Sequence, residues 1–518
     1  MTRVIDFLDH GLSRNPDGEC LREGELSFTH REVQRHTHRI AHALHQAGAG
    51  KGARVAFFTP NSALAFIGMI SVFRAGAVWL PVHPRNTLEE NAEFLRQNAC
   101  DVLFYHSRTI AEAEQFRVSV PSICKLVCLD MATRDGPAML DWAAPYPGYF
   151  VEQEASTADD IAWVKGTGGT TGRSKSVLIT NRNVAALFAT FNWCMPLTAG
   201  HRMLAAAPIS HGAGTFALCG LTNGGSTVFI ERAAADLVLD AIESHRITTL
   251  FLPPTVIYNM LAREDVRSRD YSSLKYLIYS AAPMAPERLH EALAVFGPVL
   301  TQTYGQTEAP VMLTYMSPEE HLLSDEAQWR KRLKSCGRRT AFALLEIMDD
   351  DGRILGPDQV GEIVVRGDFV MRGYHENPEE TEKASRHGWH HTGDVGMRDD
   401  DGYFYIVDRK KDMIISGGFN IFPSEIEHVL CGHPSILDCA VVGIPDPKWG
   451  EAVTAVVQLK PGASVDVEML HGFCRERLGG LKTPKRFEIW DDLPRSSAGK
   501  VLKREVREKF WQGQERRV

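Results

Sequence analysis

The N-terminal part of the chain alternates between short apolar runs and longer amphipathic segments. The apolar runs RVAFF, AVWLPV and DVLFY predict buried strands over residues 54–58, 77–82 and 101–105. The segments between them, residues 61–76 and 86–98, have the spacing of helices. Strands that alternate with helices predict a parallel sheet with right-handed crossovers.

The same succession returns further along the chain. RMLAAAPIS at Arg202 is similar to RVAFFTPNS at Arg54, an offset of 148 residues, and GSTVFI at Gly225 is similar to GAVWLP at Gly76, an offset of 149. This likeness indicates either a true internal repeat or the general similarity of any two βα units. Both interpretations predict two α/β subdomains, each with its own sheet.

Near Gly337 the sequence pattern changes to that of short strands with tight turns. Asp-Gly within ALLEIMDDDGRIL predicts a hairpin, and a small β-rich subdomain is expected up to Asp408. FPSEIEHVL then begins a helix, and DCAVVGI and AVTAVVQL have strand patterns. We therefore predict an α/β fold with a large N-terminal domain over residues 1–408, a polar hinge at 409–411 and a small α+β C-terminal domain over 412–518.

Composition and charge narrow the class of protein. A chain of 518 residues is too long for one ordinary core, and 44% hydrophobic with 24% charged residues is typical of a soluble globular protein. The net charge of −8 argues against bulk electrostatic binding to nucleic acid or anionic membrane. The longest apolar stretch, residues 63–73, is too short to span a bilayer, and the N-terminus lacks a signal-peptide core.

The ten cysteines are scattered and form no Cys-x-x-Cys pair. The closest two, Cys124 and Cys128, are interpreted as two buried thiols rather than as a metal site. Reduced thiols indicate a cytoplasmic protein.

The stretch WVKGTGGTTGRSKSV, residues 163–177, combines glycines, hydroxyls and lysines. Glycine allows successive backbone N–H groups to converge on an anion, so such a loop predicts phosphate binding. The P-loop of nucleotide hydrolases is excluded, because Arg173 and Ser174 separate Gly172 from Lys175. The alternative for this stretch alone is a flexible linker.

Four further stretches follow in order: TYGQTEA from Thr303, GWHHTGDVG from Gly388, DRKKDMIISGGFNIFPSEIE from Asp408 and LPRSSAGKVLKRE from Leu493. With the glycine-rich stretch, they resemble the signature motifs of the adenylate-forming enzymes. This superfamily includes acyl- and aryl-CoA synthetases, adenylation domains of non-ribosomal peptide synthesis and beetle luciferase. The motifs span residues 167–500, and each alone is weak evidence.

The resemblance implies that a carboxylic acid is activated by ATP to an acyl-AMP with release of pyrophosphate, and that the acyl group then passes to a thiol. Two anions must approach each other in the first step, which requires cations and N–H donors. The implied cofactors are ATP, Mg²⁺ and CoA, or the phosphopantetheine of a carrier protein. The implied phosphate contacts are Thr167, Gly168, Gly169, Thr170, Thr171, Gly172 and Lys175.

The same resemblance assigns roles within TYGQTEA. Tyr304 is expected to stack near adenine, Thr307 to contact the α-phosphate and Glu308 to bind Mg²⁺, for which a carboxylate is a suitable ligand. A solvent-facing strand and turn is the alternative. A weaker similarity assigns the neighbouring adenine-binding turn to Ala281, Ala282 and Pro283.

Asp394 and Arg409 match the residues that bind the ribose hydroxyls, since a carboxylate and a forked donor suit a vicinal diol. A surface ion pair is the alternative. Lys500 matches the lysine that neutralises charge as the acyl-AMP forms. A catalytic role is therefore implied for Lys500, as for Thr307.

The family alternates its C-terminal domain between two half-reactions, so this domain is expected to be mobile. The hinge residue is expected at Lys411, two positions after the ribose arginine. After the movement, Lys500 leaves the site, and Gly417 and Gly418 of SGGFN line a narrow tunnel for pantetheine. A hairpin turn is an alternative role for this Gly-Gly pair, and both can hold.

His211 in PISHGAG matches a position at the mouth of the acyl pocket, where we expect it to position the substrate or gate the pocket. A core histidine is the alternative. The chain departs from the family pattern at three places. The loop ends in Ser174-Lys175-Ser176 where Pro-Lys-Gly is usual, and Ala498 replaces a frequent serine. The position before Thr167 is commonly aromatic or apolar, and here it is Gly166, preceded by Lys165. None of these changes removes a charge that the chemistry requires.

The substrate is expected to carry an uncharged tail. HGAGTFALCGLTNGG contains no acidic residue to pair with an ammonium, and Phe216, Tyr258 and residues 311–315 suggest an apolar and aromatic lining. Fatty and aryl acids both fit. Three hypotheses stay open: a CoA ligase, an enzyme that passes acyl groups to an acyl carrier protein, and a catalytically silent nucleotide-binding homologue.

Overall fold

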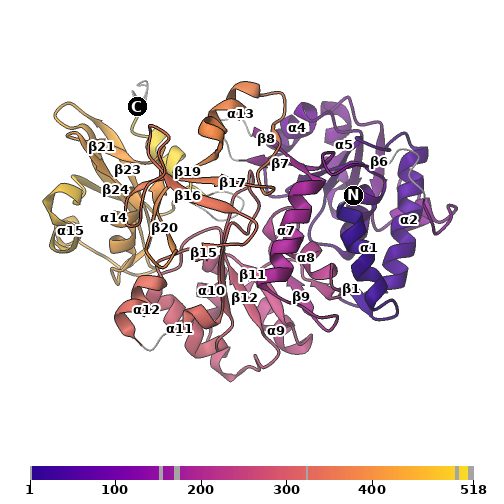
Figure 1. Ribbon diagram of the computed structural model, residues 1–518, viewed down its shortest axis with the longest axis horizontal. Helices are drawn as coiled ribbons and strands as arrows, with labels where there is room; N and C mark the ends of the chain where they lie inside the picture. The colour runs from indigo at the N-terminus through magenta and orange to yellow at the C-terminus, as the bar shows by residue number, and fades with distance from the viewer. Residues whose placement is uncertain (1–2, 151–155, 168–174, 323–324, 496–500, 512–518) are drawn as a thin grey trace. The chain divides into compact units, whose positions relative to one another are not determined.

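The structure is a computed structural model that describes residues 3–150, 156–167, 175–322, 325–495 and 501–511. The chain divides into two compact units (Figure 1). The first unit comprises residues 1–345 and 365–390, and the second comprises residues 346–364 and 391–518.

Two sheets form the framework of the first unit, as the two βα successions predict. The strand order of one sheet is β18 (Gly373–Tyr374), β8 (Lys175–Thr180), β7 (Ile161–Thr167), β4 (Val78–Val82), β3 (Arg54–Phe58), β5 (Val102–Tyr105) and β6 (Lys125–Cys128). The order of the other is β15 (Arg338–Arg339), β14 (Thr314–Met316), β13 (Leu300–Tyr304), β12 (Tyr276–Tyr279), β11 (Thr249–Leu252), β9 (Arg202–Ala205), β10 (Ser226–Phe229), β1 (Glu19–Glu23) and β2 (Leu26–Thr29). Most neighbouring strands in these sheets are parallel, and β7–β8, β8–β18, β13–β14–β15 and β1–β2 are antiparallel.

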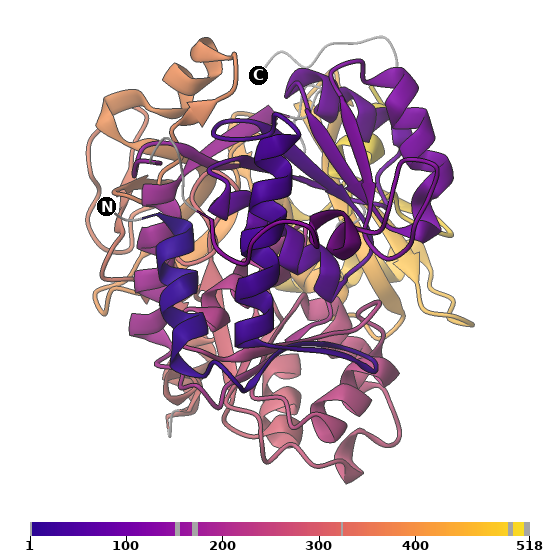
Figure 2. The ribbon, with the colours of Figure 1, turned by 90° about the vertical axis from the view of Figure 1, so that its right-hand side faces the viewer.

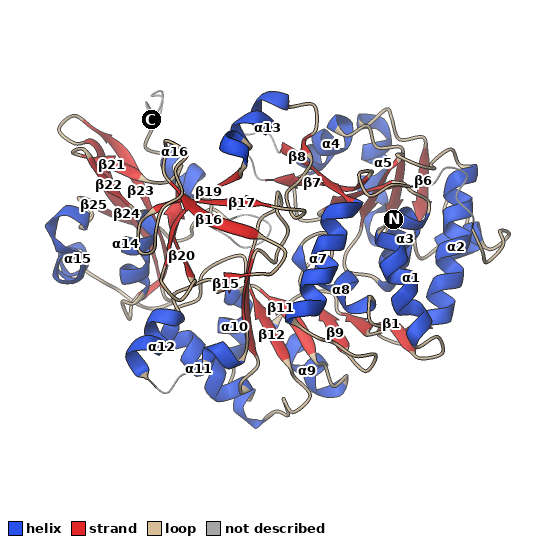
Figure 3. Cartoon of the chain, in the orientation of Figure 1, coloured by secondary structure: helices blue, strands red, loops and turns tan. Residues whose placement is uncertain are grey.

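The helices of the first unit flank these sheets (Figures 2 and 3). They are α1 (Val4–Arg14), α2 (His30–Gln46), α3 (Ala63–Arg74), α4 (Leu88–Gln97), α5 (Ile110–Ser119), α6 (Met139–Ala143), α7 (Asn181–Cys194), α8 (Gly212–Leu221), α9 (Ala235–Ser244), α10 (Pro254–Leu261), α11 (Pro286–Phe296), α12 (Glu326–Arg332) and α13 (Pro378–Ala384). Helices α1 and α2 run side by side, α7 packs on β7 and β8, and α8 packs on β9, β10 and β11. Because α7 and α8 also contact each other, they connect the two sheets.

The two sheets share an internal likeness in detail. The order β4-β3-β5 in one sheet corresponds to β10-β9-β11 in the other, and Arg54 pairs with Val78 as Arg202 pairs with Ser226. The arginines also make equivalent hydrogen bonds. Arg54 Nη1 donates to the carbonyl of Asn98 at 2.8 Å and Arg202 Nη1 donates to that of His245 at 3.2 Å, the C-cap residues of α4 and α9. These paired contacts favour a true internal repeat.

One pairing lies outside what the sequence pattern indicated. Strand β1 joins the second of the two sheets, where Leu21 is the partner of Thr227. The N-terminal hairpin β1–β2 therefore closes the edge of a sheet whose other strands begin at Arg202.

Two smaller sheets belong chiefly to the second unit. One has the order β16 (Leu344–Met348), β17 (Gly361–Arg366), β19 (His390–Arg398) and β20 (Phe404–Arg409), and the other has β22 (Phe419–Ile421), β21 (Ile414–Ser416), β24 (Gly450–Leu459) and β23 (Ile436–Asp446), with β25 (Arg486–Ile489) parallel to β24. The helices are α14 (Pro423–Cys431), α15 (Val467–Lys482) and α16 (Lys503–Glu508). The predicted hairpin in ALLEIMDDDGRIL forms its turn, and its second arm pairs with β16 through the bridge between Met348 and Ile354. The Asp349 N–H donates to the Arg353 carbonyl at 3.0 Å and the Leu355 N–H donates to the Ile347 carbonyl at 2.8 Å.

The predicted α/β fold, with a large N-terminal and a small C-terminal part, is confirmed. The compact units group the β16–β17–β19–β20 sheet with the C-terminal part, whereas the predicted boundary placed it in the N-terminal domain. The hinge at residues 409–411 stays a prediction. None of the helices in the described ranges combines the length and apolar character that crossing a membrane requires.

Candidate functional site

The predicted phosphate loop connects the two strands of an antiparallel ribbon. Thr167 ends β7 and is the direct partner of Lys175, which begins β8. Gly168, Gly169, Thr170, Thr171 and Gly172 lie outside the described residues. A loop between two strands differs from the strand-to-helix P-loop, which agrees with the exclusion of that motif.

Lys175 is contacted by side chains from β18 and from α13, the helix that follows it. Its ammonium forms an ion pair with Glu380 of α13 and lies 5.0 Å from the ring centroid of Tyr374. The pKa of Glu380 is lowered, chiefly by its hydrogen bond with Lys175 and then by that with Lys383. An incoming phosphate would therefore have to share Lys175 with Glu380.

The TYGQTEA stretch forms the end of β13 and the turn after it. Tyr304 is the last residue of the strand and is 8% exposed, and Glu308 lies in the turn, partly exposed. Gly305 is required here, because a Cβ atom would lie 2.4 Å from the backbone nitrogen of Val311. Thr307 lies in the same turn and is partly exposed.

Glu308 is oriented by Tyr374. The Tyr374 hydroxyl donates a hydrogen bond of 2.9 Å to Glu308 Oε1, and the backbone N–H of Met371 donates to the Glu308 carbonyl at 2.8 Å. Burial, followed by the charge of Glu308, raises the pKa of Tyr374, which therefore stays a donor. Within the described parts of the chain, no basic side chain forms an ion pair with Glu308, so its charge is available to a cation.

Tyr374 and Glu380 were not predicted as site residues. They lie 66 and 205 residues along the chain from the groups that they contact, Glu308 and Lys175. No local pattern in the sequence indicates such contacts, which depend on the pairing of β18 with β8.

The predicted adenine-binding turn follows β12, the neighbour of β13. Ala281, Ala282 and Pro283 are exposed, and the Ser280 hydroxyl donates to the Thr303 carbonyl at 2.6 Å. Ala281 adopts φ +73°, a conformation that is strained for a residue with a Cβ atom and that concentrates at ligand-binding sites. The turn therefore lies at the carboxyl edge of parallel strands, where ligands of α/β sheets bind.

His211 precedes α8 and is exposed. Its Nδ1 lies 2.9 Å from the Ser210 hydroxyl, and its ring packs edge to face on that of His83, with 5.0 Å between centroids. Its side chain thus lies on the surface of this unit and is not a core histidine. His83 is buried, and burial lowers its pKa to about 4.

The residues predicted to line the acyl pocket lie in different surroundings. Phe216 on α8 is fully buried and packs against Phe251, with centroids 5.3 Å apart. Tyr258 on α10 is partly exposed, and its hydroxyl accepts a hydrogen bond of 3.2 Å from the Ala285 N–H. Phe216 thus belongs to the core that supports α8.

In the second unit, Asp394 and Arg409 are directly opposite each other on β19 and β20. Their side chains form an ion pair in which Asp394 is buried and Arg409 is about half exposed. The structure therefore brings together the two groups predicted to bind the ribose. Their ion pair is compatible with both the functional and the purely structural interpretation.

Gly417 and Gly418 form the two-residue turn of the β21–β22 hairpin, with φ values of +59° and +82°. A Cβ atom on Gly417 would lie 2.8 Å from the Trp449 ring, whereas one on Gly418 would meet nothing within 4 Å. Lys411, the predicted hinge residue, is exposed, and partial loss of hydration lowers the pKa of its ammonium. Lys500 lies outside the described residues.

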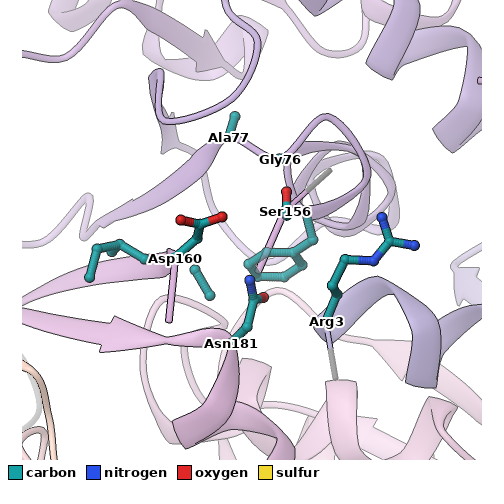
Figure 4. A pocket seen from close by; sticks show the side chains of 9 residues that line it. Arg3, Gly76, Ala77, Ser156, Asp160 and Asn181 are labelled. Atoms are coloured by element: carbon teal, nitrogen blue, oxygen red, sulfur yellow. The ribbon is translucent and has the colours of Figure 1, made fainter. Parts of the chain in front are cut away.

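A small pocket of the first unit is lined by Arg3, Ser156, Asp160 and Asn181, beside Gly76 and Ala77 (Figure 4). Gly76 and Ala77 precede β4, and this pocket therefore lies at the amino ends of the strands, away from Thr167 at the carboxyl end of β7. It takes no part in the candidate site.

A magnesium ion would have to be held mainly by its substrate. No group of three or more His, Cys, Asp or Glu side chains that could hold a metal occurs within the described ranges. Mg²⁺ commonly binds one or two protein carboxylates together with water and substrate phosphates, so the single carboxylate of Glu308 fits that ion.

Comparisons with known proteins agree with this geometry. Residues 8–375 match the family described as AMP-binding enzyme, and residues 425–500 match its C-terminal domain. The chain is 34% identical over 532 residues to the medium/long-chain-fatty-acid–CoA ligase FadD8 of Mycobacterium tuberculosis, covering 98% of this chain and 90% of the relative. It is also 34% identical over 501 residues to the feruloyl-CoA synthase of an Amycolatopsis species, covering 96% of each chain.

Among solved structures, the amide bond synthetase McbA from Marinactinospora thermotolerans is similar, with a TM-score of 0.88, 31% identity, and coverage of 98% of this chain and 100% of that one. The prediction of an adenylate-forming acid–thiol ligase is confirmed, and the chain belongs to the family of AMP-binding enzymes.

Proposed function

We propose that the protein couples ATP cleavage to the joining of a carboxylic acid with the thiol of CoA. In the first step a carboxylate oxygen attacks the α-phosphorus of ATP, and the bond to the β-phosphate bridging oxygen breaks, which releases pyrophosphate. In the second step the thiol sulfur attacks the acyl carbon, the carbon–oxygen bond to AMP breaks, and the thiol loses its proton. Together the steps yield a thioester, AMP and pyrophosphate.

The observation that carries this proposal is the arrangement of Lys175, Tyr374 and Glu308. A cation at the start of β8 would meet phosphate oxygens, and a carboxylate oriented by a tyrosine hydroxyl would bind the accompanying Mg²⁺. In this account Thr307 contacts the α-phosphate from the turn that also contains Glu308. Mg²⁺ supplies positive charge to the phosphates when it is bound.

The nucleotide is proposed to rest its adenine on Tyr304 and on the turn of Ala281, Ala282 and Pro283. Asp394 and Arg409 of the second unit are proposed to bind the ribose hydroxyls, because they pair a buried acceptor with a forked donor. We also propose that Lys500 neutralises charge in the first step, that Lys411 is the hinge, and that Thr167, Gly168, Gly169, Thr170, Thr171 and Gly172 contact phosphate.

CoA is favoured over a carrier protein as acceptor by the surroundings of Gly417. The Gly417 N–H donates to the Trp449 carbonyl at 2.8 Å, and the ammonium groups of Lys448 and Lys485 lie 4.9 and 5.7 Å from the Trp449 ring centroid. This cluster offers an aromatic face and two cations beside the proposed pantetheine turn. CoA has a nucleotide and three phosphate groups that such a cluster can bind, whereas a carrier-protein arm has one phosphate and no nucleotide.

A cytoplasmic location is part of the proposal. All ten cysteines are free thiols, which is usual in a reducing compartment. The ligase reaction also depends on ATP and CoA.

The test is pyrophosphate release from Mg·ATP with fatty, aryl and amino acids, with and without CoA. The proposal expects turnover with a fatty or aryl acid that CoA stimulates. In the variant Glu308→Ala, turnover should fall by at least about tenfold, since second-shell and ligand changes at metal sites commonly have this effect. The matched control Glu382→Ala, at an exposed position of the same unit, should keep wild-type turnover.

Release that responds to a phosphopantetheinylated carrier protein or to an amine, and not to CoA, would contradict CoA as the acceptor. Wild-type turnover in Glu308→Ala would contradict the metal role of that carboxylate. No release with any acid would contradict the proposed function as a whole.

A further inference from the structure

Lys165 is a lysine of the first unit whose position the adenylation chemistry does not explain. It lies on β7, two residues before Thr167, and its ammonium donates a hydrogen bond of 3.0 Å to the hydroxyl of Thr215 on α8. The same ammonium lies 4.9 Å from the ring centroid of Trp163 and 5.4 Å from that of Trp79. The side chain thus bridges a strand of one sheet to the helix that packs on the other.

The ammonium of Lys165 is not matched by an acid. Throughout the described ranges, no Asp or Glu forms an ion pair with it, and the loss of hydration through burial lowers its pKa to about 8. The residue is nevertheless partly exposed. Because the side chain is partly exposed while its ammonium is strongly desolvated, a ligand can still reach it.

Lys165 lies beside residues of the proposed site. β7 runs parallel to β4, with Trp163 as the partner of Trp79, and Lys165 follows toward the carboxyl end where the glycine-rich loop begins. Thr215 lies in the first turn of α8, the helix that starts directly after His211, and its hydroxyl donates to the His211 carbonyl at 3.3 Å. Lys165 therefore lies close in the chain to Thr167 and is linked through Thr215 to His211, the residue expected at the mouth of the acyl pocket.

A buried ammonium with no acidic partner is unfavourable in an apo protein, because an ion loses its hydration without compensation. The aromatic rings and the Thr215 hydroxyl return only part of that loss. An anionic oxygen from a ligand would complete the contacts of the ammonium. The first turn of α8 adds to the positive potential at this place.

We propose that Lys165 binds an anionic oxygen on the tail of the acid substrate, at the end away from the carboxylate that is activated. This inference rests on the proposed function and specifies its substrate class, which is dicarboxylic acids or acids whose tail ends in another anionic oxygen. It changes the expectation from the sequence, where the absence of an acidic residue indicated an uncharged tail. An ammonium tail stays excluded, because Lys165 would repel it.

The main alternative is that Lys165 contacts the reacting carboxylate or the α-phosphate. The two assignments differ in what the loss of the ammonium does. A lysine at the reacting centre affects every acid equally, whereas a lysine at the tail affects only acids that carry the second oxygen anion.

The test compares wild type, Lys165→Met and the control Lys334→Met, which changes an exposed lysine of the same unit. Initial rates of pyrophosphate release are measured with pairs of acids of equal length, such as hexanoate with adipate and benzoate with terephthalate. The wild type and the control should have the higher kcat/KM for the dicarboxylate of a pair. Lys165→Met should lose that preference by about ten- to hundredfold, the range for one charged hydrogen bond, chiefly through KM for the acid.

An unchanged preference in Lys165→Met would overturn the proposal, and so would an equal loss with all acids. The KM for ATP should be the same in all three proteins, and a change confined to Lys165→Met would place the ammonium at the nucleotide. A second readout is the stabilisation of each protein by the dicarboxylate alone, measured as a shift in Tm. If no acid supports pyrophosphate release, the proposed function fails. In that case, stabilisation of the wild type but not of Lys165→Met by the dicarboxylate would still support the tail site. Equal stabilisation of both proteins, or of neither, would overturn the tail site.

Discussion

The substitution Lys165→Met also makes a prediction about stability that does not depend on any substrate. Burial lowers the pKa of Lys165 from its ordinary value of 10.5 to about 8. At about 1.4 kcal/mol for each factor of ten, holding the charged form in the folded protein is unfavourable by roughly 3 kcal/mol. Methionine fills a similar volume and removes this charge.

Part of the stability gained by removing the charge is offset by the loss of favourable contacts. The ammonium is attracted to the faces of Trp79 and Trp163, which is worth about 0.5–2 kcal/mol, and it donates to Thr215. A thioether also packs well against aromatic rings, and the Thr215 hydroxyl keeps its bond to the His211 carbonyl. We expect Lys165→Met to be more stable than wild type by about 1–3 kcal/mol near neutral pH.

The dependence on pH has a defined sign. In the unfolded chain Lys165 keeps its proton up to its ordinary pKa of 10.5, whereas in the folded protein it releases the proton near pH 8. The charge of Lys165 therefore destabilises the folded protein fully below pH 8, and progressively less between pH 8 and 10.5. The advantage of Lys165→Met should therefore be largest below pH 8 and shrink toward pH 10. His83, whose ring packs on that of His211, stays neutral over this range because burial lowers its pKa to about 4.

The assay is thermal unfolding of the apo protein at pH 7 and pH 9.5, with Lys334→Met as control. At about 2.1 cal/mol/K per residue, the roughly 370 residues of the first unit convert the expected gain into a rise in Tm of about 1–4 °C at pH 7. A Tm that is unchanged or lower at pH 7 would refute the reasoning. It would show that the ammonium is either hydrated or already compensated in the apo protein.

Three further predictions follow from other contacts. Tyr374→Phe removes the donor to Glu308, so the KM for Mg·ATP in initial-rate measurements should rise about tenfold with little change in kcat, and an unchanged KM would contradict the orienting role. The sulfur atoms of Cys431 and Cys439 lie 3.6 Å apart, so the oxidant diamide should form a disulfide between them, measured as the loss of two hydrogens from the intact mass. Separate modification of the two thiols would contradict that proximity. Lys500→Ala should suppress acyl-AMP formation far more than thioester formation from supplied acyl-AMP, and equal losses would contradict the proposed alternation of the C-terminal domain.

Much of the fold could be predicted because it depends on local periodicity. The apolar runs at Arg54 and Arg202 each begin the first strand of a βα succession, as expected. The pairing of β1 with β10 could not be predicted, since Leu21 and Thr227 are brought together only by packing of the whole unit. The hairpin predicted after β16 forms, with its second arm limited to the bridge between Met348 and Ile354.

In the candidate site, too, residues in local motifs could be predicted and contacts between distant residues could not. Motifs indicated Tyr304, Glu308, Asp394 and Arg409 by type and order, and the structure places the last two opposite each other. Lys165 was named only as the residue before the departure at Gly166, because burial and the absence of an acidic partner cannot be identified from one position in the chain. Contacts such as that of Tyr374 with Glu308 depend on pairing between distant strands, which sequence patterns do not encode locally.

The central claim is that the acid is activated through its own carboxylate oxygen as an acyl-AMP. It is tested most directly with an acid labelled with oxygen-18 in the carboxylate, incubated with Mg·ATP, CoA and the wild-type protein, followed by mass spectrometry of the nucleotide. The account predicts AMP that carries one labelled oxygen on its phosphate, because the carbon–oxygen bond breaks when the thiol attacks. Unlabelled AMP, or ADP in its place, would contradict it.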